Sequence, residues 1–122
     1  MAEHTPHYLP ADRLPRTTSA AVTGGQVVVV SGNDTVAPIA APNEAWLGVA
    51  GHDAASGAQV VVYTEGVHLV GATGTIAAGK PVIGATGGTV AAFTTGTDEP
   101  EEIIGTALSA AASSKVLIKL GR

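Results

Sequence analysis

Residues 46–63, WLGVAGHDAASGAQVVVY, and residues 103–120, IIGTALSAAASSKVLIKL, are two versions of one unit. When they are aligned without gaps, Gly48 matches Gly105, and Ala-Ala-Ser at 54–56 matches Ala-Ala-Ser at 111–113. Each copy then enters an apolar run. A weaker echo precedes each copy, GQVVV at 25–29 against GKPVI at 79–83. Such self-similarity is typical of a fold that repeats one supersecondary unit, here strand, Ala-rich turn and strand.

Short apolar runs between turn residues fill the chain from residue 22 onward. They predict strands at 26–31, 46–50, 59–64, 67–70, 75–77, 81–84, 89–93, 103–108 and 115–120. ATGG at 85–88 predicts a hairpin. Ala favours helix at 107–114, but the repeat partner GHDAASG at 51–57 is a turn, so both segments are predicted to be connections. The sequence therefore predicts an all-β fold, a small β-barrel or sandwich with two quasi-repeated halves.

The first 21 residues differ in composition from the rest, and we assign them to an extended N-terminal arm ahead of a β-barrel-like domain at 22–122. Three prolines lie in this segment, and each fixes φ and removes a backbone donor. One interpretation is a frayed terminus. The alternative is an arm that becomes ordered when it binds a partner. The candidate partner-binding residues of this arm are Tyr8, Leu9, Arg13, Leu14 and Arg16.

Composition excludes several classes of function. The 122 residues suit one domain. A net charge of −4, with only six scattered basic residues, argues against a nucleic-acid partner. No apolar run approaches the roughly 20 residues of a membrane span, and the first residues lack the pattern of a signal peptide. Without cysteine, disulfides and thiolate chemistry are excluded. One Trp and one Phe make a light core, which favours completion by neighbouring chains.

No set of residues converges on chemistry, so no catalytic, metal or cofactor site is predicted. GTIAAGK at 74–80 has the spacing of a phosphate-binding loop, but Pro81 stands where Ser or Thr is needed, and a strand follows instead of a helix. The predicted structure here is a turn, with Gly79 at positive φ and Lys80 in solvent. His52 and Asp53 fit a polar turn, and the acidic run 98–102 fits a solvated loop. Trp46 and His68 are possible interface residues, with a core role as the alternative for Trp46.

The order of these segments resembles the small capsid decoration, or cement, proteins of tailed bacteriophages. The resemblance covers residues 18–120 and is carried by TGGQVVVVSG, LGVAGHDAASG, VVVYTEGVH, IAAGKPV, IIGTALSAA and VLIKL. It implies a compact β-barrel-like domain, a homo-oligomer that is often a trimer, and attachment outside the capsid at junctions between major capsid proteins. The implied partners are the major capsid protein and the chain itself. The implied location is the outer capsid surface of a virion made in the host cytoplasm.

Two other functions fit the composition less well. A carbohydrate-binding or host-surface module on a particle would display exposed aromatic residues, and this chain has few. A lipoyl- or biotinyl-like carrier also has two quasi-repeated halves, with its modified lysine at a hairpin tip between them. Lys80 is the only lysine placed midway, and its Gly-Lys-Pro context departs from that pattern. An enzyme comes last among the alternatives.

Overall fold

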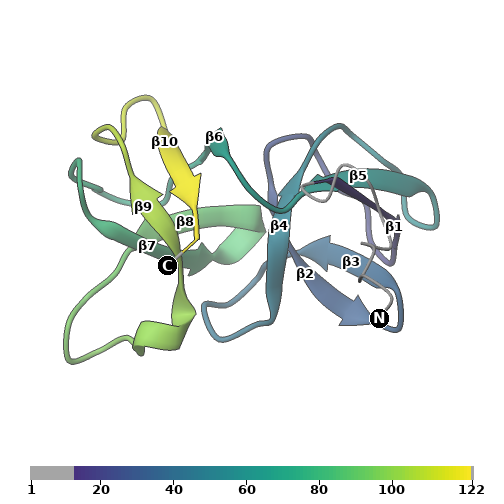
Figure 1. Ribbon diagram of the computed structural model, residues 1–122, viewed down its shortest axis with the longest axis horizontal. Coiled ribbons are helices and arrows are strands. Elements are labelled where there is room, and N and C mark those ends of the chain that lie inside the picture. The colour runs from purple at the N-terminus through teal and green to yellow at the C-terminus, as the bar shows by residue number, and fades with distance from the viewer. Residues whose placement is uncertain (1–12, 122) are drawn as a thin grey trace, which may run out of the picture.

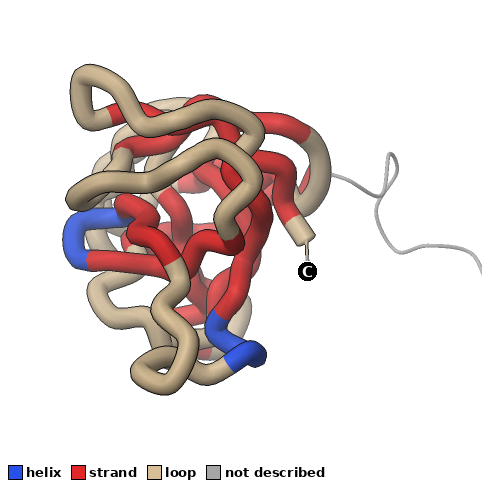
Figure 2. The backbone as a smooth tube through the Cα atoms, turned by 90° about the vertical axis from the view of Figure 1, so that its left-hand side faces the viewer, coloured by secondary structure: helices blue, strands red, loops and turns tan. Residues whose placement is uncertain are grey.

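Strands dominate the computed structural model, which describes residues 13–121. In chain order they are β1 (Arg13–Thr18), β2 (Val27–Gly32), β3 (Thr35–Pro38), β4 (Trp46–Ala50), β5 (Gln59–Tyr63), β6 (Val67–Gly71), β7 (Pro81–Ala85), β8 (Thr89–Ala92), β9 (Ile103–Ala107) and β10 (Lys115–Leu120). Two 3-10 helices, η1 (Thr86–Gly88) and η2 (Pro100–Glu102), lie at the periphery of the fold (Figure 2). The all-β prediction is confirmed, and the Ala-rich segments are connections, as expected.

The strands form two five-stranded units that lie side by side (Figure 1), a closed barrel and a curved sheet with the same cyclic strand order. We call them the first and the second barrel. The first is closed, with the strand order β1-β3-β2-β4-β5. The second half forms a five-stranded sheet with the order β6-β10-β9-β7-β8, whose edges meet at one parallel bridge between Ala72 and Val90. This bridge repeats the parallel pairing of β1 with β3. The two quasi-repeated halves expected from the sequence are therefore two five-stranded units, β1–β5 and β6–β10.

The strand register repeats between the halves, including an irregularity. Val28 pairs with Gly48, and the register then shifts between β2 and β4. Val82 pairs with Gly105, and the same shift follows between β7 and β9. A Cβ atom on either glycine would overlap the backbone carbonyl of the facing strand, so only glycine fits. Gly48 and Gly105, which match in the sequence repeat, therefore mark an unusually close approach of β4 to β5 and of β9 to β10.

Three strand predictions need correction. The arm boundary at residue 21 is not where the structure puts the change, because residues 13–18 form β1 and pair with both β5 and β3. The composition of β1 concealed it, since Pro15 is tolerated where only one side of the strand is paired. β3 was not predicted, because it is four residues long and ends in proline. The segment 75–77 is not a strand, although Ile76 is buried in the core.

Two clusters of buried apolar residues form the core of the protein. The interior of the first barrel contains the buried residues Val22, Val28, Val36, Ala50, Val60 and Val62. The second cluster fills the other barrel and extends across the junction, where Val27, Val29 and Val49 of the first barrel join it. Because these valines alternate with interior residues, they face out of the first barrel and into the contact with the second. The light composition is thus offset by packing the two barrels on a shared core.

Ile39 closes the junction between the barrels. It follows β3, is almost fully buried, and belongs to the cluster that fills the second barrel. Its Cδ1 atom lies where a side chain on Gly84 would have to be. Backbone groups reinforce the contact, since Gly88 N–H donates to the Ile39 carbonyl over 2.9 Å. A residue from the end of β3 therefore plugs the mouth of the second barrel.

Candidate interaction surface

The outer face of the second barrel carries exposed large aliphatic side chains. Val67 and Leu69 alternate along β6 on its solvent side and are 51% and 60% exposed. Leu117 lies opposite Leu69 in the neighbouring strand β10. Leu108 is 48% exposed, and its N–H donates to the Leu117 carbonyl over 2.7 Å. These four residues, Val67, Leu69, Leu108 and Leu117, form what we call the apolar patch.

The corresponding face of the first barrel is less apolar. In the second barrel Val67 pairs with Lys119 and Leu69 pairs with Leu117. The equivalent pairs of β1 and β5 in the first barrel are Arg13 with Tyr63 and Pro15 with Val61. Gly51 stands at the place of Leu108, and a Cβ atom there would meet the Tyr63 ring. The two faces are built alike, but only the second presents exposed leucines, Leu69 and Leu108, beside the half-buried Leu117. Grouped exposed aliphatics on a rigid sheet are typical of a surface that binds another protein.

The predicted arm residues are split by the structure. Tyr8 and Leu9 lie outside the described residues. Arg13, Leu14 and Arg16 lie on β1, so they belong to the first barrel. Leu14 and Arg16 line an open pocket of about 200 Å³. We call this pocket the first-barrel mouth; its lining residues are Leu14, Arg16, Val30, Asp34, Thr35, Val36 and Leu47.

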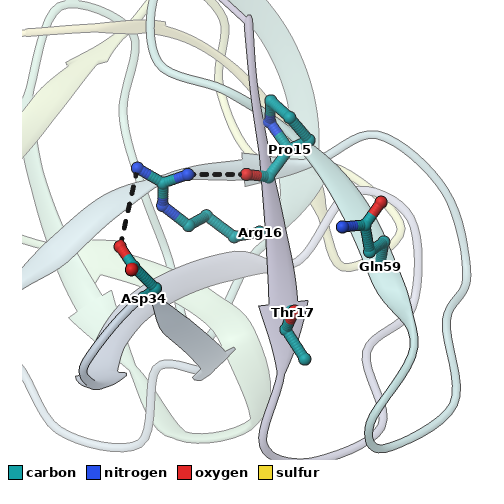
Figure 3. A pocket seen from close by; sticks show the side chains of 5 residues that line it. All are labelled: Pro15, Arg16, Thr17, Asp34 and Gln59. Carbon is teal, nitrogen blue, oxygen red and sulfur yellow. Dashed lines mark hydrogen bonds and ion pairs between the residues drawn. The ribbon is translucent and has the colours of Figure 1, made fainter.

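Arg16 organises the rim of this mouth (Figure 3). Its Nη1 atom donates to the Pro15 carbonyl over 2.8 Å, and its Nη2 atom lies 4.0 Å from Asp34 Oδ1. Asp34 sits in the turn between β2 and β3, and its side chain is 80% exposed. Gln59 and Thr17 line the adjoining pocket with these three residues. An ion pair this open to solvent contributes little to stability, so it orients polar groups at the rim.

Trp46 and His68, the possible interface residues, lie near the junction. Trp46 begins β4, is half-buried, and packs against the cluster shared by both barrels. The His68 ring centroid lies 5.6 Å from that of Tyr63, and His68 Nε2 is 2.9 Å from the Glu65 carbonyl oxygen. His68 alternates with Val67 and Leu69, so it faces away from the apolar patch. A partner-binding role for either residue remains a prediction.

The polar motifs of the sequence serve the turns in which they lie. His52 Nε2 accepts from Val61 N–H, and Asp53 Oδ1 accepts from Gly24 N–H over 2.8 Å. Gly79 has a φ of +85° and Lys80 is exposed, as predicted for the 74–80 turn. Within residues 13–121, no group of three His, Asp or Glu side chains could hold a metal ion. No helix in this range is long and apolar enough to cross a membrane.

The acidic run is tied into loop structure. Glu99 N–H donates to the Glu102 side chain over 2.9 Å, which completes a capping box at the start of η2. Asp98 Oδ2 accepts from Thr94 N–H over 2.8 Å. Glu99, Glu101 and Glu102 line one open pocket together with Glu44. This concentrates negative charge near the connection that follows β3.

A family model for phage cement proteins matches residues 10–122. The chain belongs to this family. It is therefore a capsid-associated structural protein, located at the capsid surface of the virion. The match begins before β1, in keeping with the place of β1 inside the barrel. No curated protein matches the chain.

A solved structure shares the fold. The N base of the head fiber protein gp8.5 of bacteriophage phi29 superposes with a TM-score of 0.68 at 21% sequence identity. The match covers 89% of this chain and 92% of that one. A match of this extent takes in both halves of this chain and shows that the two proteins share a fold.

Proposed function

We propose that this chain stabilises a phage capsid by bridging major capsid proteins on the outer surface of the shell, and that it does so as a homotrimer without catalysing a reaction. The observation that carries the proposal is the apolar patch of Val67, Leu69, Leu108 and Leu117 on a rigid barrel of a cement-family chain. Burial of these side chains would supply roughly 25 cal/mol for each Å² of apolar surface removed from water.

The architecture suits adhesion. Strands locked by repeated hydrogen bonds and two valine-filled cores leave little freedom to lose on binding, which lowers the entropic cost of attachment. Several identical patches on one oligomer would add their contacts, because the second and third binding events are intramolecular. A modest patch on each copy is then sufficient for firm attachment to a repeating lattice.

Capsids of the cognate phage prepared without this chain provide the test. Purified chain is added, the particles are sedimented, and their thermal melting is followed with and without bound chain. We expect co-sedimentation and a higher melting temperature. Unchanged melting with no chain in the pellet would overturn the proposal. Free chain is examined in parallel by sedimentation equilibrium, which reports the number of copies in the oligomer.

A further inference from the structure

The contact between the two barrels of one chain is built from a plug and a mouth. The plug belongs to the first barrel and consists of Ile39 and Gln26. Ile39 fills the space above Gly84, and Gln26 Nε2 donates to the Gly87 carbonyl over 3.0 Å. The Gln26 side chain also covers Gly88, where an added Cβ atom would meet it at 2.7 Å.

The second barrel repeats the apolar part of this plug. Ile39 N–H donates to the Val27 carbonyl over 2.9 Å, and Phe93 N–H donates to the Pro81 carbonyl over the same distance. These are the same hydrogen bond in the two barrels, so Phe93 occupies the place of Ile39. Ile39 is buried against the next barrel, whereas Phe93 is only half-buried.

A charged residue, Lys80, takes the place of the polar plug residue Gln26 in the second barrel. The Gln26 carbonyl accepts from Ala50 N–H over 2.9 Å, and the Lys80 carbonyl accepts from Ala107 N–H over 2.8 Å. Lys80 therefore stands where Gln26 does, and its side chain is exposed. Phe93 and Lys80 of the second barrel thus occupy the places of Ile39 and Gln26, the two residues with which the first barrel contacts the second.

The first barrel supplies the complementary mouth. Val30 pairs with Val36 as Gly84 pairs with Val90, so Val30 takes the place of Gly84 and is 49% exposed. Asp34 precedes β3 as Gly88 precedes β8, and both have positive φ, 59° and 76°. The residue that the plug lysine would face is therefore a carboxylate.

We propose that Phe93 and Lys80 of one copy dock on Val30 and Asp34 in the first-barrel mouth of the next copy, repeating between chains the contact that joins the barrels within a chain. The inference rests on the self-association in the proposed function and specifies its surface. Val30 fills the space that Gly84 leaves open, so the docked side chain cannot insert as deeply as Ile39 does. A flat phenyl ring suits that shallower floor, and the Lys80 ammonium meets the Asp34 carboxylate.

This contact is heterologous, since it joins different surfaces on the two copies. Heterologous contacts either close into a ring or continue as a filament. A finite oligomer with this contact is a ring in which every plug and every mouth is occupied. The Asp34 carboxylate lies 4.0 Å from Arg16 Nη2 of the same mouth, so the docked Lys80 ammonium would share this carboxylate with Arg16.

A charge-exchange experiment on the full chain tests the contact. Lys80→Glu, Asp34→Lys and the double variant are compared with wild type by sedimentation velocity over a range of concentrations. Lys115→Glu is the matched control, because it makes the same charge change on an exposed lysine at the start of β10. Asp34→Asn is included because Asn tolerates positive φ better than Lys does. Circular dichroism confirms that each variant is folded.

We expect each single charge reversal to raise the dissociation constant about tenfold or more, and the double variant to recover most of the loss. Asp34→Asn should weaken association less than Asp34→Lys, and Lys115→Glu should resemble wild type. A wild-type oligomer that is insensitive to Lys80→Glu and Asp34→Asn overturns the docking contact while self-association stands. A monomeric wild type overturns both, and the capsid-binding test then decides separately whether the chain is still a cement protein.

Discussion

Ile39 occupies the space that a side chain on Gly84 would need, so the end of β3 and the middle of β7 fit as plug and socket. The residues belong to different barrels, and neither barrel can be repacked at this point without moving the other. This makes the two barrels one mechanical unit. It also explains why their equivalent positions have diverged, with Gly84 in the filled mouth and Val30 in the open one.

Removal of the plug should destabilise the whole chain. Ile39→Ala leaves a cavity in the shared core, and buried Ile-to-Ala changes typically cost about 2–5 kcal/mol. Urea unfolding followed by tryptophan fluorescence measures this, since Trp46 packs against the same cluster. Val67→Ala, at a half-exposed position on β6, should change stability by less than about 0.5 kcal/mol. Equal losses for both variants would show that Ile39 has no special role.

A side chain at Gly84 should also destabilise the chain. Gly84→Val gives the second barrel the residue that the first carries at the same place, and its side chain collides with Ile39. Overpacking of this kind costs about 1–3 kcal/mol or more. The combination of Gly84→Val with Ile39→Ala should lose less than the sum of the single losses, because each change relieves the other. Strict additivity in urea unfolding would argue against direct contact.

The two close strand crossings should respond alike. Gly48→Ala and Gly105→Ala each place a methyl group against a facing backbone carbonyl, of Tyr63 and Lys119 respectively. Backbone cannot move aside as a flexible side chain can, so both variants should unfold at clearly lower temperature. Thr106→Ala, at the exposed position beside Gly105, is the control and should melt close to wild type. A tolerated alanine at either glycine would contradict the close approach.

The apolar patch should be needed for attachment but not for folding. Leu69→Lys and Leu108→Lys place a charge in the centre of the patch, where desolvation on binding is costly. Both side chains are about half exposed or more, so thermal melting of the free chain should change little. Binding to undecorated capsids should fall at least about tenfold. Ala58→Lys, an exposed site of the first barrel, adds the same charge and should bind normally.

Much of this architecture could be predicted from local pattern. The duplicated segments are β4–β5 and β9–β10, and their weaker echo is β2 and β7. Gly48 and Gly105 can be matched in the sequence because the same steric constraint, a facing backbone carbonyl, acts on both. β1 and β3 escaped, since Pro15 and Pro38 conceal strands whose partners lie far along the chain.

The interaction surfaces were beyond sequence reasoning. VHLV at 67–70 is apolar on both faces apart from His68, so nothing local tells which face is covered. That depends on which side of β6 the barrel closes. The first-barrel mouth, lined by Leu14 and Val30, is likewise a result of tertiary packing. It is open because no residue fills it in the way that Ile39 fills the equivalent site of the second barrel.

Closure of the strands has a further effect when many copies crowd on one shell. Both sides of β2 are taken by β3 and β4, and β1 joins β5 to β3, so the first barrel offers no long unpaired ladder to a neighbour. In the second half a single bridge between Ala72 and Val90 joins the two edges, and β6 and β8 remain the edge strands of the sheet. Unsatisfied sheet edges are what drive amyloid-like growth between chains. The first barrel therefore meets its neighbours on a shell through side chains and not by adding strands to a shared sheet.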